Sequence, residues 1–200
     1  MIEPKNIHCL GLNFKGVGIL TESPLYFVKS LSCLCFDGSK VVYPRDATEV
    51  WTEVELGIVM KADCFNVAEK EACQYIEGYT VSGDVTCQNV YGRDHHLAYS
   101  KSRDNFCPTQ NAITTIDIYK GTSLKMKTMI NGNVTQVGNL VDIVYHPTKV
   151  VSYLSSIAAL KKGDLILTGT CAGPENNILK PGDTVTNEIE EVGKVSYEIV

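Results

Sequence analysis

Residues 124–138 read LKMKTMINGNVTQVG and carry the strongest hairpin signal in the chain. Apolar and polar residues alternate on both sides of Asn131-Gly132, a dipeptide that favours the two-residue turn of a β-hairpin. Residues 184–200, TVTNEIEEVGKVSYEIV, form two more short runs rich in Val, Ile and Tyr, which are broken at Gly193. These two stretches predict antiparallel β-structure.

Similar strand-like runs recur through the rest of the chain. They cover residues 24–30, 38–44, 53–60, 78–86, 113–119 and 164–170. Helical patterns are fewer. The predicted class is therefore α+β, predominantly β, with a few short helices.

Two segments show helical spacing of apolar residues. Residues 66–80 place Val67, Ala72 and Ile76 on one face and reach Gly78 as a possible cap. Residues 147–164 repeat the pattern, with Lys161 and Lys162 expected in the last turn of the helix. Both helices are predicted to be short and amphipathic.

Two related turns precede strand-like runs. LKKGD at residues 160–164 and LKPGD at residues 179–183 each combine a Gly, which accepts a positive φ, with an Asp that can cap its own turn. No linker or low-complexity tract separates them from the rest. One domain over residues 1–200 is therefore expected.

Composition excludes several classes of protein. The 200 residues carry a formal net charge of −5, whereas a broad nucleic-acid footprint needs a clustered excess of Lys and Arg. No apolar run approaches the length of a membrane span. The opening MIEPKNIHCLGLNF lacks the long apolar core of a secretory signal. We therefore expect a soluble, cytoplasmic protein that binds neither nucleic acid nor membrane.

Cysteine and histidine spacing argues against structural zinc and against disulfides. The 8 cysteines include no CxxC pair, and the 4 histidines include no HxxxH or HxH arrangement. Cys33 and Cys35 are expected on one face of a strand, as packing residues of the core.

Carboxylates supply the first unusual chemistry. Glu53 and Glu55 alternate in the strand-like run EVELGIVM, so both side chains are expected on one face. A solvated sheet face is the alternative interpretation. Asp84 follows another strand-like run, and two Glu with one Asp suit Mg²⁺ or Mn²⁺. Lys101 could balance the remaining negative charge, although YSKSRDN alone also fits a surface lysine.

Five segments, in order, resemble the fumarylacetoacetate hydrolase family over about residues 7–195. EVELGIV resembles the family's ExE metal strand, and GYTVSGDVT its third-ligand segment. SKSRDNFCP is similar to the lysine segment AKxFDxxCP, and NGNVTQVGN to the NGxxxQxGN hairpin. LKKGDLILTGTCAG, followed by LKPGD, resembles the signature LxPGDxIxTGTPxG.

The resemblance implies a fold and a set of site residues. Family members fold as a mixed β-roll, usually dimerise, and act on 2-oxo or 2,4-diketo acids with Mg²⁺ or Mn²⁺. The metal ligands would be Glu53, Glu55 and Asp84. Lys101 matches the active-site lysine and Thr170 a substrate-contacting threonine. Asp104 matches the aspartate of the lysine segment and is a candidate substrate contact.

The chain departs from the family pattern at positions that hydrolysis uses. Leu12 and Gln88 stand where the family has arginines, and Gln88 is retained as a candidate substrate contact. The family's HxxE lid dyad is missing: residues 1–25 are expected to hold a lead strand and a possible lid, in which Glu22 is the only acid after Phe14. Arg93 or Arg103 could replace a lost arginine.

The predicted function follows from what is kept and what is lost. A bound cation and a lysine suffice for enolate chemistry, but hydrolysis also needs a base that activates water. We therefore expect an Mg²⁺- or Mn²⁺-dependent homodimeric enzyme of a small oxo acid, with decarboxylation or tautomerisation slightly ahead of C–C hydrolysis. The alternative is a homologue that binds metal and a small carboxylic acid without turnover.

Overall fold

The computed structural model describes residues 2–17, 23–88, 94 and 96–200. Strands form most of the regular structure in this part of the chain. They are β1 (Ile7–Gly11), β2 (Leu25–Lys29), β3 (Leu34–Phe36), β4 (Lys40–Val41), β5 (Val50–Met60), β6 (Ile76–Cys87), β7 (Cys107–Thr109), β8 (Lys125–Ile130), β9 (Asn133–Asn139), β10 (Leu165–Leu167), β11 (Thr184–Ile189) and β12 (Gly193–Ile199).

Helices are short. The two α-helices are α1 (Ala98–Lys101) and α2 (Pro147–Ile157), and 3-10 turns occupy η1 (Leu31–Cys33), η2 (Glu69–Tyr75), η3 (Leu140–Asp142) and η4 (Pro174–Asn176). No helix in the described residues is long and apolar enough to cross a membrane.

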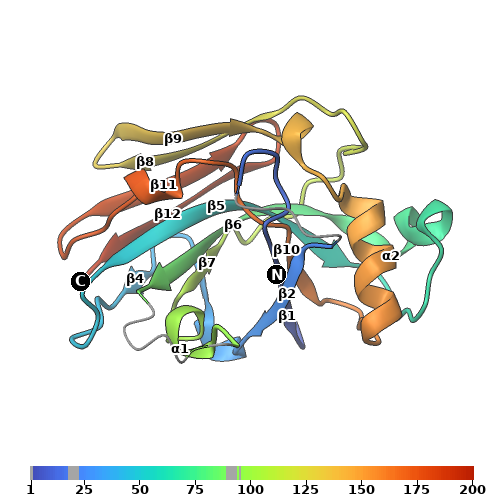
Figure 1. The fold of residues 1–200 in the computed structure, drawn as a ribbon, viewed down its shortest axis with the longest axis horizontal. Helices are drawn as coiled ribbons and strands as arrows, with labels where there is room; N and C mark the ends of the chain where they lie inside the picture. The colour runs from blue at the N-terminus through green and yellow to red at the C-terminus, as the bar shows by residue number, and fades with distance from the viewer. Residues whose placement is uncertain (1, 18–22, 89–93, 95) are drawn as a thin grey trace.

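The strands form two sheets. The seven-stranded sheet has the order β2-β1-β10-β5-β6-β7-β3, and the five-stranded sheet the order β4-β12-β11-β8-β9. Three pairs, β1/β10, β3/β7 and β4/β12, are parallel, and the other pairs are antiparallel. The five-stranded sheet lies over β5 and β6, and α2 packs at one end (Figure 1). The predicted mixed, mainly β fold is confirmed.

The long hairpin of β5 and β6 carries two different faces. Val54, Leu56 and Ile58 point into the main core, which the second sheet and α2 also build. The alternate positions Glu53 and Glu55 point to the opposite face, as a period of two requires.

The Asn131-Gly132 turn was predicted correctly. Both residues have positive φ values, 53° and 79°, as a type I′ turn requires, and they join β8 to β9.

Two predicted elements, a strand and a helix, did not form as expected. Residues 113–119 form no strand: Thr114 makes one isolated bridge with Tyr79, while Ile118 packs into the core without a strand partner. The helix expected at residues 66–80 is only the 3-10 turn η2, because from Ile76 the backbone pairs with β5 instead.

The second helix is shorter than predicted, and one cysteine lies elsewhere. α2 ends at Ile157, so Lys161 and Lys162 lie beyond its last turn, where the chain has already turned to bridge with Cys64. Cys33 lies in η1 rather than in a strand, although it is buried, as Cys35 is.

Candidate metal centre

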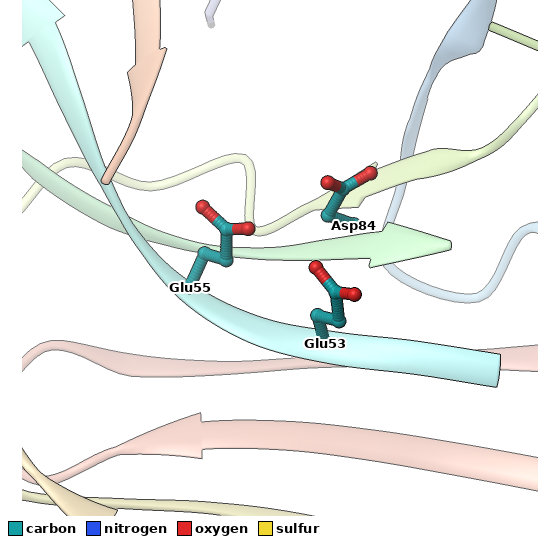
Figure 2. A group of neighbouring side chains, drawn as sticks. All are labelled: Glu53, Glu55 and Asp84. Atoms are coloured by element: carbon teal, nitrogen blue, oxygen red, sulfur yellow. The ribbon is translucent and has the colours of Figure 1, made fainter. Parts of the chain in front are cut away.

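Three carboxylates converge on one face of the seven-stranded sheet (Figure 2). Glu53 and Glu55 come from β5, and Asp84 comes from β6, where it lies directly opposite Glu53 in the antiparallel register. One oxygen from each carboxylate lies within 4.8 Å of the others. The structure therefore brings together the three residues that the sequence analysis selected.

Burial makes this cluster costly without positive charge nearby. Glu55 is 1% exposed and Asp84 0% exposed. Burial, reinforced by the charges of Asp84 and Glu53, raises the pKa of Glu55 well above its usual value. Oxygen ligands with high local negative charge are the donor set that Mg²⁺ and Mn²⁺ prefer, so the residues present fit a divalent cation.

Two lysines lie against the cluster. The Lys101 Nζ, at the end of α1, lies 2.6 Å from Asp84 Oδ2 and 3.0 Å from Glu53 Oε2. The Lys29 Nζ, from β2, lies 2.5 Å from Asp84 Oδ1. Burial alone would raise the pKa of Asp84, but the ammonium groups of Lys101 and Lys29 outweigh it and hold that pKa below its usual value.

Lys29 is a site residue that the sequence analysis missed. Three strands separate β2 from β6 in the sheet, which in a flat sheet would be about 19 Å. The ion pair between Lys29 and Asp84 therefore shows that the sheet curls over the site. The available signal was a lysine in the otherwise apolar run PLYFVKS.

The loop after β10 closes the far side of the cluster. The Gly169 N–H donates a 2.6 Å hydrogen bond to Glu55 Oε2, and the φ of Gly169 is +88°, a conformation that favours glycine. Next to it, Thr170 lines the cavity, and its hydroxyl accepts a 3.2 Å hydrogen bond from Gln136 Nε2 of β9. The second sheet thus fixes this loop over the first.

A cavity of about 170 Å³ opens above the carboxylates. Its floor is the triad with Lys101, and its walls are mainly apolar, including Leu10, Leu12, Leu25 and Phe27. The arrangement can hold a small anionic ligand against a cation while an apolar wall limits access of water.

The other predicted site residues lie outside this cavity. Asp104 is exposed, and Gln88 is exposed at the end of β6, where it hydrogen-bonds Thr48. Arg103 forms an ion pair with Asp46 at 2.9 Å rather than lining the cavity. Substrate contacts by Asp104 and Gln88 stay predictions.

Two further expectations fall outside the described residues. They concern Arg93 and the segment 18–22, which contains Glu22. His8 lies in β1, ahead of the segment in which a lid was expected to carry its side chains.

Residues 9–200 match the family model described as fumarylacetoacetate (FAA) hydrolase C-terminal. A 2,4-didehydro-3-deoxy-L-rhamnonate hydrolase from Sphingomonas sp. (strain SKA58) is 32% identical over 206 residues, which cover 96% of this chain and 72% of that protein. The 4-hydroxyphenylacetate degradation bifunctional isomerase/decarboxylase of Escherichia coli is 32% identical over 198 residues, covering 96% of this chain and 44% of that protein.

Solved structures agree with these sequence matches. The crystal structure of 2-hydroxyhepta-2,4-diene-1,7-dioate isomerase from Mycobacterium marinum superposes with a TM-score of 0.89 at 30% identity, covering 100% of this chain and 75% of that one. The relatives thus include hydrolases, isomerases and decarboxylases. On the match from residue 9 to residue 200, the chain belongs to the fumarylacetoacetate hydrolase family.

Proposed function

We propose that this protein is an enzyme that uses Mg²⁺ or Mn²⁺ to act on a small 2-oxo or 2,4-dioxo acid through an enolate. One observation carries the proposal. Three converging carboxylates, two of them buried, lie with Lys101 at the floor of a small cavity. The hydrolase and isomerase activities named for its relatives support the same class of substrate.

Each residue of the site has its own role in this proposal. Glu53, Glu55 and Asp84 would hold the cation, which when bound supplies a Lewis acid for charge that develops on the 2-oxo oxygen. Lys101 places a fixed positive charge at the same floor, where it can stabilise that oxygen further. Thr170 offers a hydroxyl to a substrate oxygen.

Decarboxylation or tautomerisation fits the cavity better than hydrolysis does. Hydrolysis requires a base that activates water. Among the described residues that line the cavity there is no histidine, and no carboxylate beyond the triad. We therefore place C–C hydrolysis last. Decarboxylation forms the enolate by releasing CO₂ and needs no base, and tautomerisation passes a C3 proton to solvent and back but needs no activated water as nucleophile.

The test is NMR of oxaloacetate and acetylpyruvate in D₂O with enzyme, first with Mg²⁺ and then with EDTA. Enzyme-dependent decarboxylation, or deuterium exchange at C3, that EDTA abolishes is the expected result. Acetate released from acetylpyruvate would instead establish hydrolysis. Because oxaloacetate decays slowly with Mg²⁺ alone, only the rate above that of a Glu55→Gln control counts.

Two variants separate metal binding from turnover. Glu55→Gln should lose Mn²⁺ binding in calorimetry, because it removes a buried anionic ligand. Lys101→Met should still bind Mn²⁺ but turn over about 10²–10³-fold more slowly. Full activity of Lys101→Met would contradict its role as charge stabiliser.

A second candidate is a homologue that binds metal and a small acid without turnover. The observation in its favour is that Leu12 and Gln88 stand where the family has two arginines. Leu12 lines the cavity with an apolar side chain, which cannot bind a carboxylate. Mg²⁺-dependent binding of oxalate, with no turnover over a broad panel of oxo acids, would establish it.

The remaining features rest on the family resemblance. We propose a homodimer, which sedimentation velocity would test; a monomer at micromolar concentration would contradict it. The assignment of residues 1–200 to one domain and the cytoplasmic location stay predictions.

A further inference from the structure

A second hollow adjoins the metal cavity and shares two of its walls. It measures about 360 Å³ and meets the first cavity at Glu53 and Pro174. Trp51 and Ile178 supply its apolar surface, and their backbones form a bridge. A ligand whose head lies on the carboxylate triad could therefore extend its tail past Pro174 onto the indole of Trp51.

Trp51 is fixed in place from two sides. Its indole Nε1–H donates a 2.9 Å hydrogen bond to Glu53 Oε1, the oxygen that does not contact Lys101. The loop that carries Ile178 is tied to β5 by buried Asn177, whose Nδ2 donates to the Thr52 carbonyl at 2.9 Å. The apolar surface of the hollow is therefore formed before any ligand arrives, which lowers the entropic cost of binding.

The charge around this hollow is negative. Glu49 and Glu175 are exposed walls, and Glu53 is a third. Among the described residues that line either hollow, the only cation is Lys101, which already contacts Asp84 and Glu53. A tail that ended in a carboxylate would lie among like charges, whereas an uncharged tail would only bury apolar surface.

We infer that the hollow at Trp51 is a specificity subsite for an uncharged, apolar acyl tail, and that it selects against oxo acids with a second carboxylate. The inference rests on the proposed function, because the triad must bind the oxo-acid head for a tail to reach Trp51. It adds the class of substrate: monocarboxylic oxo acids with an aliphatic or aromatic tail.

The test measures binding of oxo acids that the proposed reactions cannot cleave. Pyruvate has no tail, 2-oxo-4-phenylbutanoate has an aromatic tail, and 2-oxoadipate has a carboxylate tail. Calorimetry with Mg²⁺ present should give 2-oxo-4-phenylbutanoate an affinity at least about tenfold above that of pyruvate. 2-Oxoadipate should bind no more tightly than pyruvate.

Two variants test the two parts of the inference. Trp51→Leu should remove the advantage of 2-oxo-4-phenylbutanoate over pyruvate, and expressing the result as a ratio corrects for any weakening of the metal site through Glu53. Glu175→Lys, on an exposed residue that can be changed without repacking, should raise the ratio of 2-oxoadipate to pyruvate affinity about tenfold. Glu71→Lys makes the same charge change on an exposed residue outside both hollows and should leave this ratio alone.

The outcomes separate this inference from the proposed function. Pyruvate binding with no preference among tails, or a preference for 2-oxoadipate in the unmodified protein, would overturn the subsite alone. A tail preference that Trp51→Leu does not change would also overturn it. Failure of all three acids to bind with Mg²⁺ would overturn the proposed function, and the subsite with it.

Discussion

Replacing Lys29 with methionine tests the electrostatic structure of the site most directly. The Lys29 Nζ lies 2.5 Å from Asp84 Oδ1, and both side chains are 0% exposed. At that separation, and an effective dielectric constant of about 20, their attraction is about 7 kcal/mol before the cost of removing both charges from water. Deleting one partner of a buried ion pair typically costs about 3–5 kcal/mol.

We expect Lys29→Met to lose about 3 kcal/mol of unfolding free energy in the absence of metal, near the low end of that range. The reason is that Lys101 still contacts Asp84, at 2.6 Å, so the carboxylate is not left without a partner. Methionine keeps the length and the apolar volume of the side chain, so packing changes little.

The same substitution should strengthen metal binding. With every group ionised, the three carboxylates and the two lysines carry one net negative charge, and Lys29→Met makes it two. A divalent cation should therefore stabilise the variant more than the unmodified protein. A ligand at one hundred times its Kd adds about 2.7 kcal/mol to the unfolding free energy. Excess Mn²⁺ can therefore offset most of the stability that Lys29→Met loses without metal.

The assay is urea denaturation followed by far-UV circular dichroism, in EDTA and in excess Mn²⁺. Lys15→Met is the matched control, because Lys15 is largely exposed and lies 3.8 Å from Asp142, a surface pair that contributes little. Unchanged stability of Lys29→Met in EDTA would refute the charge-compensation argument. Weaker stabilisation of the variant by Mn²⁺ would refute the argument on metal affinity.

Three further predictions concern the rest of the fold. Burial would raise the pKa of Asp164, but hydrogen bonds from His8 and backbone N–H groups outweigh it and hold the pKa low. The ionised Asp164 therefore makes its full contribution to the unfolding free energy above its unfolded-state pKa of about 3.9. This contribution is lost as the pH falls toward the lower folded-state pKa. Asp164→Asn should cost about 2 kcal/mol at neutral pH and flatten the acid limb of the stability curve measured by urea denaturation; parallel curves would contradict this. Gly138→Ala should cost about 1–3 kcal/mol in the same assay, because its Cβ would overlap the Cys171 Sγ. An unchanged urea midpoint would count against that contact. Cys73 is the one exposed cysteine, so a thiol reagent should modify one group rapidly in the native protein and none in Cys73→Ser.

The elements that the sequence predicted well are those whose signal is local. The turn at Asn131-Gly132 depends on two residues that accept a positive φ. Asp164 and Asp183 each cap the turn in which they lie. The carboxylate of Asp164 accepts a 2.8 Å hydrogen bond from the Lys161 N–H, and that of Asp183 accepts one of 2.7 Å from the Lys180 N–H. Such features need no information from distant parts of the chain.

Prediction was poorer where a distant partner decides the local structure. Residues 66–80 have helical periodicity, but pairing of Ile76 with Met60 of β5 ends the helical turn early. Residues 113–119 alternate like a strand, yet only Thr114 forms a bridge, with Tyr79 of β6, and the residues that follow it do not continue the pairing. Periodicity reports which side chains are buried, and it does not report what the backbone pairs with.

The candidate site shows the same contrast between local signals and distant contacts. Sequence alone placed Glu53 and Glu55 on one face, since alternation in a strand settles this. It also selected Asp84 as a third oxygen ligand, and the motif resemblance implied the same three ligands. Only the tertiary structure brought Lys29 to Asp84 and set Trp51 beside a second hollow. The physical reason is that the ion pair depends on the curl of the sheet, and the hollow depends on the packing of the loop between β10 and β11 against β5. No short stretch of sequence encodes either contact.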